Sequence, residues 1–166
     1  KLNRASLADK AGWAAAHVTL PQYDVAAMAE ATKAAPAWVH FGTGNIFRAF
    51  IAVLSQRLLN EGLTDKGIIM ANTHDPAIID TVFTPYDNLC ISVVLNPDAT
   101  TRREIVGSIA EGLKADSSNE AAMARFKEIF TNPSLQMLSF TITEKGYALR
   151  QPDGAFLPAV EADMEE

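Results

Sequence analysis

The stretch WVHFGTGNIFRAF, at residues 38–50, limits the possible folds more than any other part of the chain. Mostly apolar residues lead into Gly42 and Gly44, after which apolar residues recur at helical spacing until a break at 60–62. A second apolar run, GIIMANTH, follows at 67–74. A buried strand, a glycine turn, a helix and a second buried strand in this order predict a βαβ unit with parallel strands.

The rest of the chain indicates further elements around this unit. We expect helices over 6–16, 24–34, 75–83 and 119–131, the first with Ser6 at its N-cap and the last with Asn119. The runs at 89–95 and 101–109 predict two strands joined by a turn, and 135–143 predicts another strand. The predicted fold class is α/β: a Rossmann-type, doubly wound, mostly parallel sheet with a β-hairpin elaboration, in one domain over 1–166.

Charge and cysteine content narrow the classes of partner. The formal net charge is −6, and the densest basic cluster is the pair Arg102 and Arg103, so nucleic acid is not an expected partner. The single Cys90 excludes an internal disulfide, and its apolar neighbours predict a buried, inert thiol. Without a signal peptide or a membrane-spanning apolar stretch, the sequence predicts no membrane association and a cytoplasmic protein.

The last residues indicate a longer chain. FLPAVEADMEE follows a predicted turn in RQPDGA, at 150–155, and stops without a closing strand or a capped helix. We therefore expect the sequence to be a fragment.

The glycine turn has the chemistry of a dinucleotide site. Gly42 permits the tight turn, and Gly44 lets a pyrophosphate approach the backbone where a Cβ would otherwise lie. The helix that follows offers unpaired amides and the positive end of its dipole, and Arg48 adds a positive charge. The third glycine of the usual fingerprint is replaced by Phe47, which implies a slightly wider separation of helix and strand. The candidate cofactor-binding residues are Gly42, Thr43, Gly44, Asn45, Ile46, Phe47 and Arg48.

Two further points about this site stay open. The glycines can also serve only to make a βα turn, because a lone G-x-G is a weak motif. Asp75, the acidic residue after the second strand, can accept hydrogen bonds from the adenosine ribose, which disfavours a 2′-phosphate. It can equally cap the helix that follows.

Two longer motifs together are much more specific than the pair of glycines alone. VHFGTGNIFRAFIA, at 39–52, and SFTITEKGYAL, at 139–149, resemble the polyol-specific long-chain dehydrogenases, the mannitol dehydrogenase family. This family includes mannitol 2-dehydrogenase, mannitol-1-phosphate dehydrogenase and the fructuronate and tagaturonate reductases. The resemblance implies an oxidoreductase that uses NAD, without a metal, to interconvert a secondary alcohol and a ketone on an open-chain sugar derivative. It covers only the family's amino-terminal, nucleotide-binding domain.

The resemblance also implies that the catalytic residues lie outside this chain. The family's general base, a lysine with asparagine and histidine partners, lies in a carboxy-terminal helical domain, and no part of this chain matches that motif. We therefore expect no catalytic residue in this chain, and we expect the missing domain of the same chain to be its partner. The segment TEKGY, at 143–147, lies at a strand end facing the cleft in such proteins. Glu144 and Lys145 are thus candidate substrate-binding residues, with solvated loop side chains as the alternative.

The subfamily and the wider function also have alternatives. Phe47 and Phe50 stand where mannitol 2-dehydrogenases often have a histidine pair, which favours the hexuronate reductase or mannitol phosphate branches. The expected substrate is therefore a sugar alcohol or a hexonate such as mannonate. A rival hypothesis is an NAD(H)-binding module without catalysis, and a third is a purely structural α/β domain.

The histidines do not indicate a metal site. The three are far apart in sequence and lack carboxylates or thiols at ligand spacing: His17, His40 and His74. We expect His40 to be a strand residue whose ring nitrogen has a hydrogen-bond partner.

Overall fold

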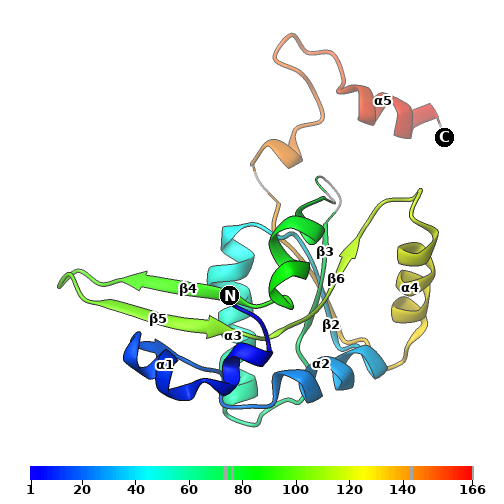
Figure 1. Ribbon diagram of the computed structural model, residues 1–166. Helices are drawn as coiled ribbons and strands as arrows, with labels where there is room; N and C mark the ends of the chain where they lie inside the picture. Colours follow the sequence, from blue (N-terminus) through cyan, green and yellow to red (C-terminus); the bar gives the residue numbers. More distant parts are fainter. Residues whose placement is uncertain (73–74, 76, 143, 166) are drawn as a thin grey trace.

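The computed structural model describes residues 1–72, 75, 77–142 and 144–165. Its main sheet contains four parallel strands in the order β6-β3-β2-β7 (Figure 1). These strands are β2 (Trp38–Phe41), β3 (Ile68–Asn72), β6 (Ile109–Lys114) and β7 (Met137–Phe140). Along the chain the order is 3-2-1-4, which is the arrangement in the first part of a Rossmann sheet. The predicted α/β fold class and the βαβ unit are confirmed.

A smaller sheet contains β1 (Val18–Thr19), β5 (Thr101–Val106) and β4 (Cys90–Leu95), in the order β1-β5-β4. β4 and β5 pair antiparallel, and Figure 1 shows this hairpin extending away from the main sheet. The predicted hairpin is confirmed, but β1 was not predicted.

The prediction of one strand over 101–109 is wrong. β5 ends at Val106, and β6 begins at Ile109 and pairs with β3 in the main sheet. The polar groups of the two residues between them bond to the helix beneath: Gly107 N donates to Gln56 Oε1 at 2.7 Å, and Ser108 Oγ donates to Ala52 O at 2.6 Å. The chain therefore passes from one sheet to the other without leaving these buried groups unpaired.

The α-helices among the described residues are α1 (Lys10–Ala15), α2 (Val25–Ala34), α3 (Ala52–Asn60), α4 (Glu120–Thr131) and α5 (Pro158–Glu165). Asn119 is the N-cap of α4, as predicted, and its Oδ1 accepts from Ala122 N. The predicted start at Ser6 is wrong because Ala5–Ala8 forms a 3-10 turn and Asp9 caps α1, accepting from Gly12 N at 2.9 Å.

Both faces of the main sheet are covered (Figure 1). In β3 all five residues are buried, with Ile68 and Met70 facing one core and Ile69 and Ala71 the other. The first core includes side chains of the helix that follows β2, and the second includes side chains of α4. Burial on both faces explains the continuous apolar runs that identified these strands.

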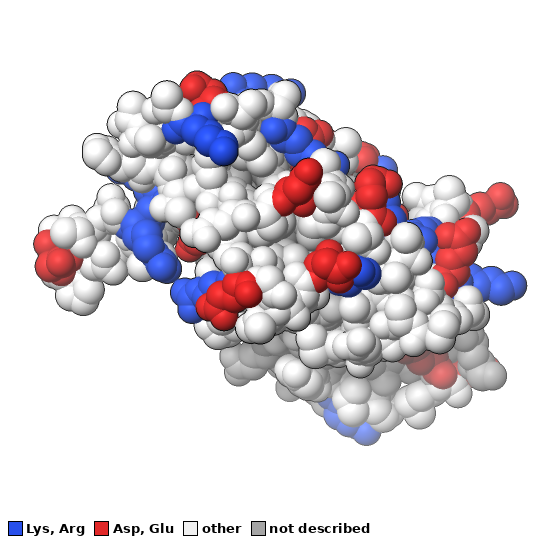
Figure 2. Space-filling model, turned by 90° about the horizontal axis from the view of Figure 1, so that it is seen from below, with Lys and Arg blue, Asp and Glu red and all other residues white. Residues whose placement is uncertain are grey.

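After β7 the chain leaves the sheet. The predicted turn at 150–155 is confirmed, since Gln151 N donates to Ala155 O at 2.8 Å. The final residues then form α5, which was not predicted and stands apart from the sheet in Figure 1. Over the described residues, we find no helix with the length and apolarity needed to cross a bilayer. On the face seen in Figure 2, acidic and basic side chains lie interspersed.

Candidate nucleotide-binding site

The candidate site lies at the carboxyl ends of the parallel strands. β2 is the first strand of the sheet in sequence, and it pairs with β3 on one side and with β7 on the other. The strand order therefore reverses between β2 and β7, and in open α/β sheets the crevice outside such a reversal is where ligands bind. The glycine turn follows β2 at this point, so the fold places the predicted motif at the expected edge.

The two glycines of the turn differ in their surroundings. Gly42 has a φ of 134°, and a Cβ there would overlap Thr141 Oγ1 and lie 3.2 Å from His40 Nε2. A Cβ on Gly44 would have no atom within 4 Å among the described residues. Gly42 is therefore needed for the fold itself, whereas Gly44 leaves open space over the turn, as close approach by a ligand requires.

A helix starts directly after the turn. Helical conformation begins at residue 45, and the bond from Arg48 N to Gly44 O, at 3.1 Å, closes its first turn. The turn Phe47–Ile51 is π-helical and leads into α3. The amides of residues 45–47 precede that first bond, so they have no acceptor within the helix. Together with the helix dipole, these amides can stabilise an anion.

Asn72 connects the glycine turn to the loop after β3. Its Nδ2 donates to Thr43 Oγ1 and to Asp75 O, both at 2.9 Å. The Thr43 side chain is buried, so it supports the turn and only its backbone can face a ligand. Sequence reasoning missed Asn72, although a polar residue at the end of an otherwise apolar strand was a usable signal.

Asp75 is exposed, and its backbone oxygen accepts from Ile78 N at 3.2 Å. Its carboxylate makes no hydrogen bond with a described residue, so the structure shows neither a capping bond nor another contact for it. Both interpretations of Asp75 therefore stay open.

Phe47 stands where the usual fingerprint has its third glycine. Its side chain is fully buried and stacks on His40 of β2, with ring centroids 4.5 Å apart and 6° between the planes. Phe47 can thus offer a ligand only its backbone amide. The side chain of Ile46, by contrast, is 67% exposed beside the turn.

Arg48 points back along its own helix. Its Nη2 donates to Asn45 Oδ1 at 2.7 Å, and its guanidinium lies 5.8 Å from the ring centre of Phe83. Arg48 Nε is buried and has no hydrogen-bond partner among the described residues. The guanidinium therefore holds Asn45 and keeps a positive charge within a turn of the glycines.

Cys90 lies near this guanidinium but is not activated by it. Burial raises the pKa of the Cys90 thiol to about 11, and the opposing effect of Arg48 is smaller. The thiol is protonated at neutral pH, which agrees with the predicted inert cysteine.

His40 has partners on both ring nitrogens, as predicted for one. Nδ1 lies 2.8 Å from Ser139 Oγ, and Nε2 lies 3.3 Å from Thr141 Oγ1. Trp38 Nε1 donates to the same Ser139 Oγ at 2.6 Å. Burial lowers the pKa of His40 to about 4, so the ring is neutral at physiological pH.

The remaining predicted residues are only partly described. The backbone of Glu144–Tyr147 forms a 3-10 turn after β7, beside the strand reversal. Thr143 and the side chains of Glu144 and Lys145 lie outside the described residues, so their predicted contact with substrate stays a prediction. Within the described part of the chain, no three His, Cys, Asp or Glu side chains gather as metal ligands.

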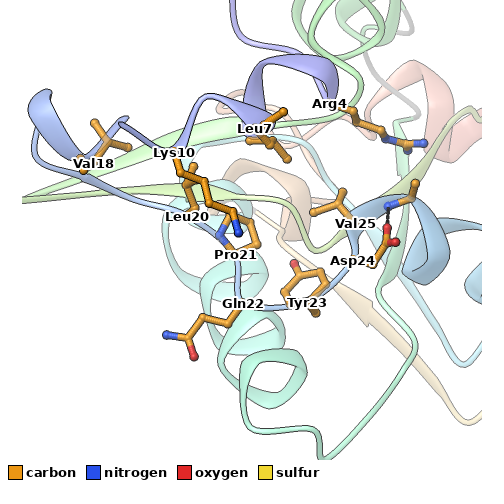
Figure 3. A pocket seen from close by; sticks show the side chains of 13 residues that line it. Arg4, Leu7, Lys10, Val18, Leu20, Pro21, Gln22, Tyr23, Asp24 and Val25 are labelled. Carbon is orange, nitrogen blue, oxygen red and sulfur yellow. Dashed lines mark hydrogen bonds between the residues drawn. The ribbon is translucent and has the colours of Figure 1, made fainter. Parts of the chain in front are cut away.

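An open hollow of about 900 Å³ lies elsewhere (Figure 3). It is lined by residues of the first 26 positions, among them Leu7, Leu20 and Val25. None of its lining residues belongs to the glycine turn or to the strand ends of the main sheet. We therefore place the candidate site at the turn and not in this hollow.

Comparison with known proteins gives the family of the chain and agrees with the fold. A D-mannonate oxidoreductase from Thermotoga maritima is 46% identical over 165 residues, which are 99% of this chain and 30% of that protein. A mannitol 2-dehydrogenase from Aspergillus niger is 32% identical, over 89% of this chain and 28% of that protein. The chain belongs to the mannitol dehydrogenase family. It spans about 30% of the length of the curated relatives it matches.

Solved structures of family members have the same fold. The ternary complex of Pseudomonas fluorescens mannitol 2-dehydrogenase with NAD and D-mannitol matches 99% of this chain with a TM-score of 0.74 and 25% identity, over 32% of that chain. A D-sorbitol dehydrogenase matches 91% of this chain with a TM-score of 0.68 and 27% identity, over 30% of that chain. A scan against protein-family models found no match.

Proposed function

We propose that this chain is the nucleotide-binding domain, over residues 1–166, of a longer NAD-dependent oxidoreductase. The proposed reaction interconverts a secondary alcohol and a ketone on a sugar alcohol or a hexonate such as mannonate. The observation that carries the proposal is the glycine turn, which lies where the strand order reverses and leaves open space over Gly44. The 46% identity to a D-mannonate oxidoreductase supports the substrate class.

The residues present fit a dinucleotide. The pyrophosphate would be held by the amides at the start of the helix and would lie against Gly44, where no Cβ intervenes. When bound, the nicotinamide cofactor accepts or donates a hydride. The chain's own contribution is to bind and orient it: Thr43 and Asn72 fix the turn, and the pair of Asn45 and Arg48 fixes the first turn of the helix.

Asp75 supports NAD as the cofactor over NADP. Its exposed carboxylate follows β3, where it can accept from ribose hydroxyls and repel a 2′-phosphate. Asn72 holds the backbone of Asp75 against the glycine turn, so the loop position is fixed relative to the phosphate site.

The catalytic base, substrate selection and cellular location complete the proposal. We assign the base to a part of the longer protein beyond this chain, and we keep Glu144 and Lys145 as candidate substrate contacts. A cytoplasmic location without a nucleic-acid partner is supported by the acidic net charge and the single, unpaired Cys90.

Calorimetric titration with NADH and with NADPH tests the cofactor site. We expect NADH to bind the chain more tightly than NADPH, and we expect Gly44→Val to abolish binding because its side chain would occupy the pyrophosphate position. Ala49→Val, on an exposed position of the same helix, is the matched control and should bind as the original chain does. Absence of NADH binding to a chain that is folded by circular dichroism would contradict the proposal.

Turnover tests the second half of the proposal. The longer protein is expected to reduce NAD with mannonate or mannitol, or to oxidise NADH with the matching keto sugar. Cofactor binding without turnover of any polyol, hexonate or ketouronate would favour a binding module without catalysis.

A further inference from the structure

Four side chains form a hydrogen-bonded row across the strands that meet at the site. Trp38 and His40 lie on β2, Ser139 lies on β7 opposite His40, and Thr141 follows β7 at its carboxyl end. The row passes from Trp38 Nε1 to Ser139 Oγ at 2.6 Å, from Ser139 Oγ to His40 Nδ1 at 2.8 Å, and from His40 Nε2 to Thr141 Oγ1 at 3.3 Å.

The direction of the protons in this row depends on the tautomer of His40, and the donor and acceptor capacity of each group favours one direction. The indole of Trp38 can only donate, so Ser139 Oγ accepts there. The single hydroxyl proton of Ser139 then has His40 Nδ1 as its acceptor among the described residues. His40 is neutral, so a ring that accepts at Nδ1 carries its proton on Nε2 and donates to Thr141 Oγ1.

The consequence concerns the end of the row. Because Thr141 Oγ1 accepts from His40, its own proton is directed away from His40. No described residue accepts it. Thr141 is only partly buried, and its Oγ1 lies so close to Gly42 that it would overlap a Cβ there. The hydroxyl is therefore held against the first glycine of the turn, with a proton to donate.

We propose that Thr141 donates a hydrogen bond to an oxygen of the nicotinamide half of the bound dinucleotide, and that Trp38, Ser139 and His40 position its hydroxyl for this. The loop after β3, with Asp75, lies on one side of β2, and Thr141, which follows β7, lies on the other. The adenosine half is assigned to the side of Asp75, so the opposite half of the cofactor reaches Thr141. This inference rests on the proposed NAD site.

The position of the row also accounts for Phe47. Its ring covers His40 by stacking, which excludes water from the ring and keeps His40 neutral. A glycine at 47 would leave His40 uncovered on that face. Phe47, which replaces the third glycine of the usual fingerprint, therefore covers the histidine of the row.

Binding of NADH, ADP-ribose and AMP to conservative variants tests the proposal. We expect Thr141→Val to bind NADH about tenfold more weakly, since one hydrogen bond is lost, while AMP binding is unchanged. Thr141→Ser keeps the hydroxyl and should bind NADH within about twofold of the original chain. Titration of Thr141→Val with ADP-ribose identifies the acceptor atom. If ADP-ribose affinity falls as much as NADH affinity, the acceptor is a ribose or phosphate oxygen. If ADP-ribose affinity is unchanged, the acceptor is the nicotinamide amide, and both kinds of acceptor belong to the proposed half of the cofactor.

Nitrogen-15 shifts of the His40 ring test the positioning role separately from binding. A protonated Nε2 and an unprotonated Nδ1 are expected, and Ser139→Ala should shift this tautomer ratio and weaken NADH binding severalfold. Equal NADH affinity of Thr141→Val and the original chain, or a proton on Nδ1, would overturn the inference. Failure of every nucleotide to bind the original chain would instead contradict the proposed function.

Discussion

The pair Gly42 and Gly44 allows structure and binding to be separated by substitution. Gly42→Ala forces a side chain into a backbone with a φ of 134°, and the new Cβ would overlap Thr141 Oγ1. Backbone strain of about 1–3 kcal/mol and overpacking of about 1–3 kcal/mol together predict a loss of about 4 kcal/mol. For a domain of this size the melting temperature falls about 2–4 °C per kcal/mol, so a fall of roughly 10 °C is expected.

Gly44→Ala is the matched substitution, two positions further along the chain. Its Cβ meets no described atom within 4 Å, so the free energy of unfolding should change by less than about 0.5 kcal/mol. Its NADH affinity should nevertheless fall, because the methyl group lies where the pyrophosphate approaches. Differential scanning calorimetry of both variants measures the stability, and titration of Gly44→Ala with NADH measures the affinity. A normal melting temperature for Gly42→Ala, or an equal loss in Gly44→Ala, would refute this account of the turn.

Three further outcomes are expected. Gln56→Leu should lower the unfolding free energy in urea by about 3 kcal/mol, because Gly107 N and Ile105 O lose a buried partner; a change below about 1 kcal/mol would contradict this. His40 has a folded pKa of about 4, below its unfolded value of 6.5, so stability is full above pH 6.5 and falls as the pH drops towards 4, by about 2 kcal/mol between pH 7 and pH 5. His40→Gln should remove that slope from urea unfolding curves, and an unchanged slope would show that His40 is not its source. Asp75→Ser should raise NADPH affinity relative to NADH in titrations, whereas an unchanged ratio would favour a capping role alone.

The sequence predicted the elements whose signals are local. The buried strand before Gly42, observed at Trp38–Phe41, was predicted because its apolar run and the glycine after it are local signals. Asn119 was recognised as an N-cap because its side chain bonds within its own helix. These features need no knowledge of the rest of the fold.

The errors occurred where the fold depends on distant partners. The strand over 101–109 is divided because Gly107 and Ser108 bond to the helix at Gln56 and Ala52, about fifty positions earlier. β1 has only two residues and is defined by its pairing with β5. Neither set of contacts can be predicted from the local pattern of apolar residues.

In the candidate site, too, local features were predicted from the sequence and features that depend on distant partners were not. The glycine turn was visible in the sequence, but the roles within it were not, since Phe47 and Thr43 turn their side chains inward. Asn72, Ser139 and Thr141 were missed because their importance comes from partners on other strands. The prediction that Arg48 supplies charge near the phosphates is still a prediction.

The central claim is that the glycine turn holds the dinucleotide, and amide shifts in a nitrogen-15 labelled chain during titration with NADH test it most directly. The account predicts the largest shifts at Gly44, Asn45 and Ile46, with smaller changes around the hollow lined by Leu7 and Val25. Shifts centred on that hollow, or no shifts at the turn when NADH is saturating, would contradict the account.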